Sequence, residues 1–240
     1  MKNMLSKNKH QLIMGQILRD IYFDVSISSL LGFKGGTCAY FFYGLTRFSV
    51  DLDFDLFLSN EATQKLVHDK IGRLLNKYGN IKESYIKQNT IFFLLSYGDN
   101  DHNIKVELST RTLVPDIRGH YELREYLGIS AFVGKKDYLF ASKLVALIDR
   151  KILAVRDIYD IWFFAKNNWD ISAKVISART GKGIREHIAD CLLAIESVKD
   201  SEILHGVAEF LPSEKEKAWV KNYLKEETIF LLKNYLSVLK

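Results

Sequence analysis

The chain has 240 residues, 48% of them hydrophobic, so it can bury the core of one large domain or two small ones. Its 34 Lys and Arg against 29 Asp and Glu give a formal charge of +5, which slightly favours polyanionic partners. No run of eighteen apolar residues occurs, and no secretion signal follows the charged N-terminus. We therefore expect no membrane segment and a cytoplasmic location.

The cysteines and histidines carry no motif. Cys38 and Cys191 are the only cysteines and form no CxxC pair, which fits a reducing compartment and argues against a structural zinc site. The six histidines form no HxH, HxxxH or HExxH pattern, so none is predicted to bind a metal.

The first half of the chain mixes helix and strand patterns. Hydrophobic periodicity and turn residues predict, in order, a helix at about 5–23, a strand at 32–34, a helix at 37–43, a strand at 51–58, a helix at about 61–78, strands at 81–86 and 90–97, a turn at 98–101 and a strand at 103–109. Residues 110–135, with several glycines and a proline, read as a connecting segment. The strands predict a mixed sheet.

The strand at 51–58 carries alternating carboxylates. Because residues i, i+2 and i+4 of a strand share a face, Asp51, Asp53 and Asp55 should point one way and the apolar residues between them into a core. Like charges on one face repel, so the pattern predicts a bound cation. The alternative is a solvated edge strand with its charges outward.

A glycine turn precedes this strand. Gly35 and Gly36 lie between a short strand and a helix, where backbone N–H groups can hold phosphate. Transfer of a nucleotidyl group needs such donors for a triphosphate and two carboxylates that hold Mg²⁺ against it. The stretch from Phe33 to Asp55 could supply both.

The second half is predicted to be helical, with helices at about 137–148, 154–166, 184–198 and 215–239 and a basic loop at 177–183. If residues 143–160 formed one helix, then Lys143, Arg150 and Asp157 would recur every seven residues and form one polar stripe. A break near 150–153 is equally compatible with the pattern. The arginines of this segment either brace phosphate or form surface pairs, Arg150 with Asp157 and Arg156 with Asp160.

Three ordered motifs carry a resemblance. The chain has a Lys-Gly-Gly-Thr turn at 34–37, an Arg-x-Ser-x-Asp-x-Asp-Phe strand at 47–54 and a Lys…Arg…Arg-Asp-x-x-Asp segment at 143–160. In this order they resemble the AbiEii/AbiGii toxin family of DNA polymerase β-like nucleotidyltransferases.

The resemblance implies roles for the matching residues. Asp51 and Asp53 would bind two catalytic Mg²⁺ ions, and the best candidate for a third carboxylate is Glu107, as metal ligand or as base, unless it is only an exposed strand residue. Lys143 would act with them in catalysis. The residues that would bind the nucleoside triphosphate are Lys34, Gly35, Gly36, Thr37, Arg47, Ser49, Arg150, Arg156, Asp157 and Asp160.

The sequence thus predicts an α/β protein with an N-terminal mixed-sheet nucleotidyltransferase domain at 1–135 and a C-terminal helical domain at 136–240 that completes the nucleotide cleft. The resemblance further implies a toxin with a separate antitoxin, active in growth inhibition or abortive infection, and an RNA acceptor such as tRNA. Two alternatives remain open, which are nucleotidylation of a small molecule such as an aminoglycoside and a non-catalytic nucleotide-binding module.

Overall fold

A computed structural model describes residues 2–98 and 102–239. Over these residues the α-helices are α1 (Lys2–Phe23), α2 (Gly35–Tyr43), α3 (Glu61–Leu75), α4 (Lys136–Asp149), α5 (Val155–Lys166), α6 (Ala173–Thr180), α7 (Ile184–Glu196) and α8 (Glu214–Val238). The strands are β1 (Leu31–Lys34), β2 (Asp51–Leu56), β3 (Asn80–Lys87), β4 (Thr90–Tyr97), β5 (His102–Ser109), β6 (Tyr121–Tyr126) and β7 (Ile129–Gly134). The predicted α/β class with a mixed sheet before a helical region is confirmed.

The chain divides into two compact units. The first unit comprises residues 1–44, 49–112 and 116–134, and the second comprises residues 45–48, 113–115 and 135–240. Two short segments, 45–48 and 113–115, therefore pack with the helical second unit although they lie in the first half of the sequence.

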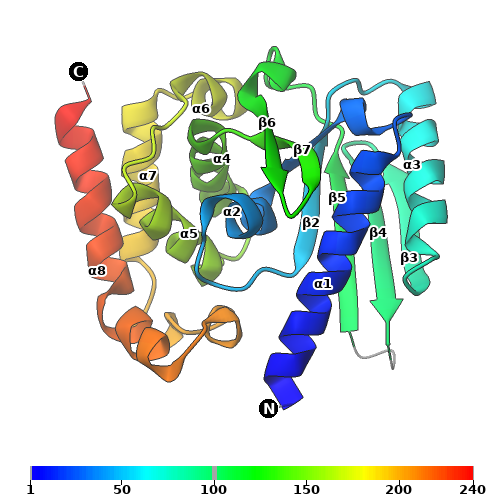
Figure 1. The fold of residues 1–240 in the computed structure, drawn as a ribbon. Helices are drawn as coiled ribbons and strands as arrows, with labels where there is room; N and C mark the ends of the chain where they lie inside the picture. The colour runs from blue at the N-terminus through cyan, green and yellow to red at the C-terminus, as the bar shows by residue number, and fades with distance from the viewer. Residues whose placement is uncertain (1, 99–101, 240) are drawn as a thin grey trace. The chain divides into compact units, whose positions relative to one another are not determined.

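The first unit is built on one sheet with the strand order β3-β4-β5-β2-β1-β7-β6. The β2–β5 and β1–β7 pairs are parallel and the other neighbours are antiparallel. Figure 1 shows α1 crossing the sheet over β2 and β5, and α3 beside β3 and β4. The apolar face of the sheet is buried with these helices, through residues such as Phe33, Phe54 and Val106.

Local signals explain the helix ends of this unit. The Asn60 side chain accepts a hydrogen bond of 2.9 Å from the Thr63 backbone N–H and so caps α3. Gly44 ends α2 with φ +74°, a left-handed conformation that glycine adopts without steric cost.

The segment 110–135 was predicted wrongly as a connection, because it contains the β6–β7 hairpin and a short 3-10 helix at Ile117–His120. The hairpin turns through Leu127 and Gly128, both at positive φ. Two-residue turns of this kind usually have Asn or Asp at the first position, and because Leu127 stands there, the sequence lacks the usual hairpin signal.

The α-helices of the second unit are α4–α8. Figure 1 shows α8 at one edge of this group, beside α7. The core of the unit includes Phe140, Leu144, Ile158, Phe164 and Leu232, all buried. Ser213 caps α8 by accepting a bond of 3.2 Å from the backbone N–H of Glu216, the N-terminal pattern of a capping box.

Two details of this unit differ from the expectations. The loop expected at 177–183 begins as α6, which reaches Thr180 before Gly181 ends it. The continuous helix across 143–160 does not form, since Arg150 is extended (φ −74°, ψ 133°) and α5 starts at Val155. The break is therefore the correct alternative.

The predicted turn at 98–101 lies outside the described residues except for Gly98, which has φ +68°. Among the helices that the structure describes, none combines the length and the apolar character needed to cross a membrane.

Candidate active site

The glycine turn and the carboxylate strand lie against each other in the first unit. Gly35 is the first residue of α2 and has φ +78°. A Cβ atom built there would come within 2.4 Å of Asp53 Oδ2, so only glycine fits. The first N–H groups of a helix have no partner within the helix and attract anions. The turn therefore presents backbone donors directly beside the Asp53 carboxylate.

Thr37 and Ser49 hold the start of β2 against α2. The buried Thr37 hydroxyl donates to the backbone carbonyl of Asp51, and its Oγ1 lies 2.9 Å from Ser49 Oγ. These contacts position the residue that begins the carboxylate strand. The hydroxyls are occupied by protein groups, so the phosphate role predicted for Thr37 would fall to its backbone N–H.

Strand pairing brings Glu107 next to Asp53. In the parallel β2–β5 ladder, Asp53 is opposite Glu107 and Asp51 is opposite Lys105, so all four side chains share one face of the sheet. Lys105 Nζ lies 3.6 Å from Asp51 Oδ2. Asp51, Asp53 and Glu107 are all partly exposed.

The pKa of Asp53 reports this crowding. Burial and then the negative charge of Asp51 raise it to about 6, Glu107 adds to the effect, and Lys105 and Lys34 oppose it. Asp53 is therefore held in a place where its negative charge is costly unless a cation compensates it.

Asp55 has a different environment from Asp51 and Asp53. It is buried, and it accepts hydrogen bonds from Lys34 Nζ at 2.6 Å and from the Tyr121 hydroxyl at 2.5 Å. Its charge is thus compensated within the fold, and the Lys34 ammonium, predicted to contact nucleotide, is bonded to this carboxylate.

A second cluster of predicted residues lies in the second unit. Asp160 accepts two bonds from Arg47, Nε–Oδ1 at 2.6 Å and Nη2–Oδ2 at 2.7 Å, and is fully buried. Lys143 Nζ lies 2.9 Å from Asp157 Oδ1 and 2.9 Å from Asp160 Oδ2. Arg150 Nε lies 2.7 Å from Asp157 Oδ2. Because α4 and α5 are separate helices, this cluster arises from their packing and not from a seven-residue repeat.

The electrostatics of this cluster follow from its composition. Burial alone would raise the pKa of Asp160, but Arg47 and Lys143 outweigh burial and hold it below its usual value. Burial alone would lower the pKa of Lys143, but the negative charges of Asp157 and Asp160 outweigh burial and raise it. Three cations and two carboxylates leave the cluster with one excess positive charge at neutral pH. The alternative interpretation predicts two surface pairs. Arg150 does pair with Asp157, although Asp157 is buried, whereas among the described residues Arg156 forms no ion pair with Asp160.

Apart from Arg156, the predicted residues therefore gather in two clusters, one in each unit. Sequence reasoning did not identify Lys105 and Tyr121 as members of the first cluster. Lys105 could have been noted as the residue two before Glu107 on the same strand face, whereas no local signal links Tyr121 to Asp55.

A metal ion at these carboxylates would need further ligands. Among residues 2–98 and 102–239, no group of three or more His, Cys, Asp or Glu side chains stands ready to hold one. Mg²⁺ is usually held in nucleotide enzymes by one or two carboxylates together with substrate phosphates. Asp51 and Asp53 lie on one face of β2 and supply that donor set, with Glu107 opposite Asp53. The residues present therefore fit Mg²⁺ that binds with a nucleotide.

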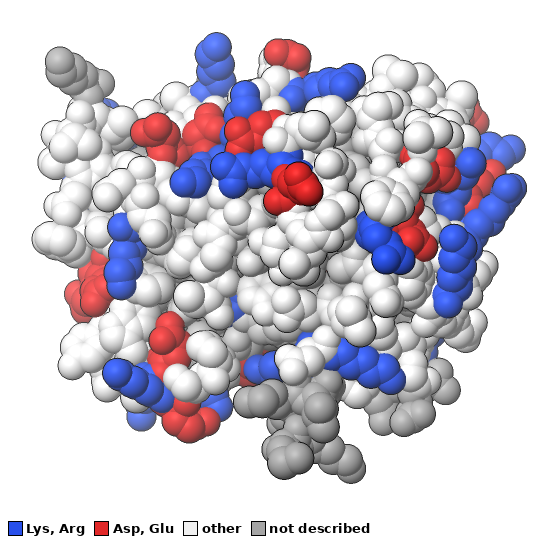
Figure 2. Space-filling view, viewed as in Figure 1, with Lys and Arg blue, Asp and Glu red and all other residues white. Residues whose placement is uncertain are grey.

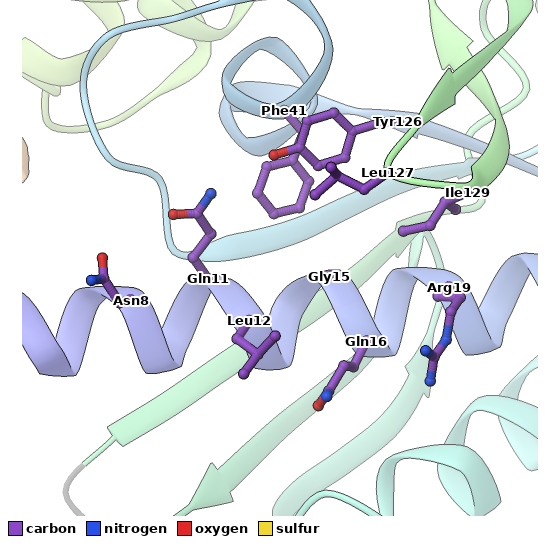
Figure 3. A pocket seen from close by; sticks show the side chains of 10 residues that line it. All are labelled: Asn8, Gln11, Leu12, Gly15, Gln16, Arg19, Phe41, Tyr126, Leu127 and Ile129. Carbon is purple, nitrogen blue, oxygen red and sulfur yellow. The ribbon is translucent and has the colours of Figure 1, made fainter.

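A separate cavity lies elsewhere in the first unit. It encloses about 330 Å³ between α1, Phe41 of α2 and the β6–β7 turn, and no predicted site residue lines it among the described residues. Figure 3 shows the rings of Phe41 and Tyr126 beside Leu127 above α1, with Gln11 pointing towards them. It is distinct from the carboxylate site.

A mixed sheet with a glycine turn against paired carboxylates is the arrangement of a nucleotidyltransferase, and comparisons with known proteins agree. The chain belongs to the family described as nucleotidyl transferase AbiEii toxin of a type IV toxin–antitoxin system, whose model matches residues 16–225. The resemblance inferred from the motifs is thereby confirmed.

Solved structures that share the fold include the following two. MenT4, a nucleotidyltransferase toxin from Mycobacterium tuberculosis H37Rv, is 16% identical with a TM-score of 0.60, over 100% of this chain and 91% of that one. JHP933 from Helicobacter pylori is 17% identical with a TM-score of 0.58, over 97% and 92%. The search of curated proteins found no match.

Proposed function

We propose that this nucleotidyltransferase moves a nucleoside monophosphate from a nucleoside triphosphate to a hydroxyl of an RNA acceptor, such as a tRNA, with Mg²⁺ as cofactor. The observation that carries the proposal is the close approach of Gly35 to Asp53, together with the pairing of Asp53 with Glu107. The backbone N–H groups that can bind phosphate and the carboxylates that can bind a metal therefore lie at one place.

The chemistry is an in-line displacement. The acceptor oxygen forms a bond to the α-phosphorus, the bond from that phosphorus to the bridging oxygen breaks, and pyrophosphate leaves. The backbone N–H groups of Gly35, Gly36 and Thr37 bind the phosphates at the start of α2. Glu107 would accept the proton of the attacking hydroxyl, or else would be a third metal ligand.

Asp51 and Asp53 would hold the Mg²⁺ ions, two by analogy with the family. When bound with the triphosphate, Mg²⁺ neutralises the charge that develops on the phosphate oxygens. The chain's own contribution is to keep both carboxylates on one strand face, with Thr37 and Ser49 fixing the start of that strand.

The second cluster would bind negative charge. Its excess positive charge suits Lys143 and Arg150 to triphosphate oxygens, with Asp157 and Asp160 orienting them. Arg150 is the most exposed member, with a side chain 41% exposed, and can reorient toward a ligand at the least cost. Arg156 is assigned here as a further phosphate contact.

The net charge of the chain supports an RNA acceptor. The formal charge of +5 favours a polyanion. Figure 2 shows Lys and Arg intermixed with Asp and Glu over the face in view, so the excess charge forms no single broad patch there. RNA binding would then be localised rather than spread over that face.

The family description names a toxin–antitoxin system, and we propose that this toxin acts with a cognate antitoxin in growth arrest or abortive phage defence. Expression of the chain alone should arrest growth, and co-expression of the antitoxin should restore it. Growth arrest by an Asp51→Asn, Asp53→Asn double variant as strong as that by the wild type would contradict a catalytic toxin.

The central experiment incubates the protein with each α-labelled nucleoside triphosphate, Mg²⁺ and total cellular RNA, followed by a denaturing gel. Label in an RNA band, absent for the Asp51→Asn, Asp53→Asn variant, is the expected result. Label on a small molecule would move the acceptor to the aminoglycoside class, and equal label for both proteins would overturn the metal assignment. Activity on RNA should also fall steeply with salt.

A further inference from the structure

One row of side chains crosses five strands of the sheet. Lys34 of β1 is opposite Asp53 of β2, which is opposite Glu107 of β5. Glu107 is in turn opposite Phe92 of β4, and Phe92 is opposite Tyr85 of β3. Residues paired in register share a face of the sheet. The carboxylates therefore continue, on the same face, into two aromatic side chains.

The aromatic side chains form a stacked platform, here called the Tyr85–Phe92 pair. Their ring centroids are 4.9 Å apart and the ring planes are inclined by 14°. Lys87 Nζ lies 4.0 Å from the centre of the Tyr85 ring. Both rings are partly exposed and Lys87 is exposed, so ring surface and positive charge are presented together.

The opposite face of these strands is used differently. Ile91 and Phe93 of β4 are fully buried, and His68 of α3 stacks on Phe93 at 4.9 Å and contacts Ser84 of β3. That face is covered by α3. The β3–β4 hairpin thus buries one face against α3, and the Tyr85–Phe92 pair lies on its other face.

We propose that the Tyr85–Phe92 pair binds the bases of a single-stranded RNA acceptor whose terminal hydroxyl lies at Asp53 and Glu107. This inference rests on the proposed function. Bases stack on aromatic rings without regard to sequence, and nearby cations bind the intervening phosphates. The same combination, with Lys87 beside the rings and Lys105 next to Glu107 on β5, occurs here.

The spacing suits such a strand. Phe92 and Tyr85 are two and three strands away from Asp53, or about 10 to 14 Å at the usual distance between neighbouring strands. This is the length of about three to four stacked nucleotides. The neighbouring row, Asp55–Ser109–Thr90–Lys87, adds two hydroxyls and a cation along the same path.

The charges on this face favour RNA over a peptide with apolar anchors. Lys87 and Lys105 flank the path, and Glu83, opposite Leu94, is the acidic side chain of β3 on this face. The path thus carries a positive charge at Lys87 beside the rings, whereas Lys105 is paired with Asp51. It is acidic at its Glu83 edge and at the carboxylates where Mg²⁺ is proposed.

The test measures binding and turnover separately. A short unstructured RNA with a 5′ fluorophore and a free 3′ end is titrated with the full chain, and kcat and KM are measured for RNA and for the nucleotide. The variants are Tyr85→Leu and Phe92→Leu, which keep an apolar side chain but remove the ring, and Tyr85→Phe, which keeps the ring. Tyr126→Leu is the matched control, since Tyr126 also stacks on a neighbour, Phe41, at 5.2 Å and 10°.

We expect Tyr85→Leu and Phe92→Leu to raise the Kd and KM for RNA about tenfold, with the KM for nucleotide unchanged. Tyr85→Phe and Tyr126→Leu should bind as the wild type does. Should the Leu variants fail to fold by urea titration, Lys87→Gln replaces them, and the slope of log Kd against log salt should fall by about one.

Three results separate the two proposals. If the wild type labels RNA but the variants bind RNA equally well, the Tyr85–Phe92 pair is overturned and the proposed function stands. If the wild type binds RNA through the pair but transfers nothing to it, the RNA-acceptor function fails and the binding site stands. If the wild type neither binds nor labels RNA, both are overturned.

Discussion

Arg47 holds Asp160 through two hydrogen bonds of 2.6 and 2.7 Å, although 113 residues separate them in the sequence. Both side chains are buried, and Asp160 is fully so. Lys143 completes the arrangement at 2.9 Å from the same carboxylate. Removing one partner from a buried and fully paired charge lowers the stability of the fold strongly.

The first prediction concerns this pair. Arg47→Met should lower the free energy of unfolding by about 3 kcal/mol, because Asp160 loses its bidentate partner inside the fold. Arg47→Lys should lose less, since it keeps the charge but not the planar fork. Urea titration measures both. The control is Glu214→Gln, which breaks an exposed pair with Lys217 and should change stability by about 0.5 kcal/mol or less. Equal losses for Arg47→Met and Glu214→Gln would refute the assigned role.

The second prediction separates backbone strain from the Asp53 contact. Gly35→Ala and Gly44→Ala both place alanine at positive φ, +78° and +74°. Each should cost about 1 to 2 kcal/mol of stability from strain. Only at Gly35 does the new methyl meet a carboxylate, whereas nothing lies within 4 Å at Gly44. We expect Gly35→Ala to lower kcat/KM by about a hundredfold and Gly44→Ala to leave it near the wild-type value. Similar activity in the two variants would show that the close approach has no part in catalysis.

The third prediction uses the raised pKa of Asp53. The folded value of about 6 exceeds the ordinary value of 3.8, so the ionised form is disfavoured in the fold. The resulting cost is absent below pH 3.8, grows between pH 3.8 and about 6, and is constant above. Asp53→Asn should therefore be more stable than the metal-free wild type at pH 8, by about 1 to 2 kcal/mol, with no difference near pH 3.8.

Metal binding should reverse this order. Mg²⁺ with a nucleotide should raise the Tm of the wild type but not that of Asp53→Asn. Asp55→Asn is the matched control, because it removes a carboxylate that Lys34 and Tyr121 already compensate. It should be less stable than the wild type and keep the Mg²⁺ response. A Mg²⁺ response that survives in Asp53→Asn would exclude this residue as a ligand.

The fourth prediction concerns pH and His10. Its Nδ1 lies 2.5 Å from the Tyr97 hydroxyl and its Nε2 lies 3.1 Å from the Val50 carbonyl oxygen, which suits a neutral ring with the proton on Nε2. Burial lowers its pKa, and His102 adds to this effect, although the Val50 bond and Asp51 oppose it. With the folded pKa below 6.5, the unfolded chain gains the proton first as the pH falls.

The stability that neutral His10 contributes should therefore be complete above pH 6.5 and decrease as the pH falls below it. His10→Gln should be less stable at pH 8 but should lack the decrease between pH 6.5 and 5, which urea midpoints at several pH values would reveal. Parallel pH profiles for the two proteins would contradict a neutral, buried His10.

The local elements of the fold were largely predictable from the sequence. The strands at 90–97 and 103–109 and the capped helix after Asn60 have short-range signals, which are alternation, turn residues and an Asn cap. The β6–β7 hairpin was missed because its turn carries Leu127, and α6 because it is only eight residues long.

By itself, the sequence determined the alternation of Asp51 and Asp53 on one strand face, the glycine turn before them and the family, because each is a short-range pattern. Only the tertiary structure decided that β5 pairs with β2 in the register that sets Glu107 opposite Asp53, that Tyr121 covers Asp55, and that Arg47 reaches Asp160. These contacts join residues distant in the chain, and strand order and helix packing are selected by burial of apolar surface over the whole unit rather than by local residue patterns.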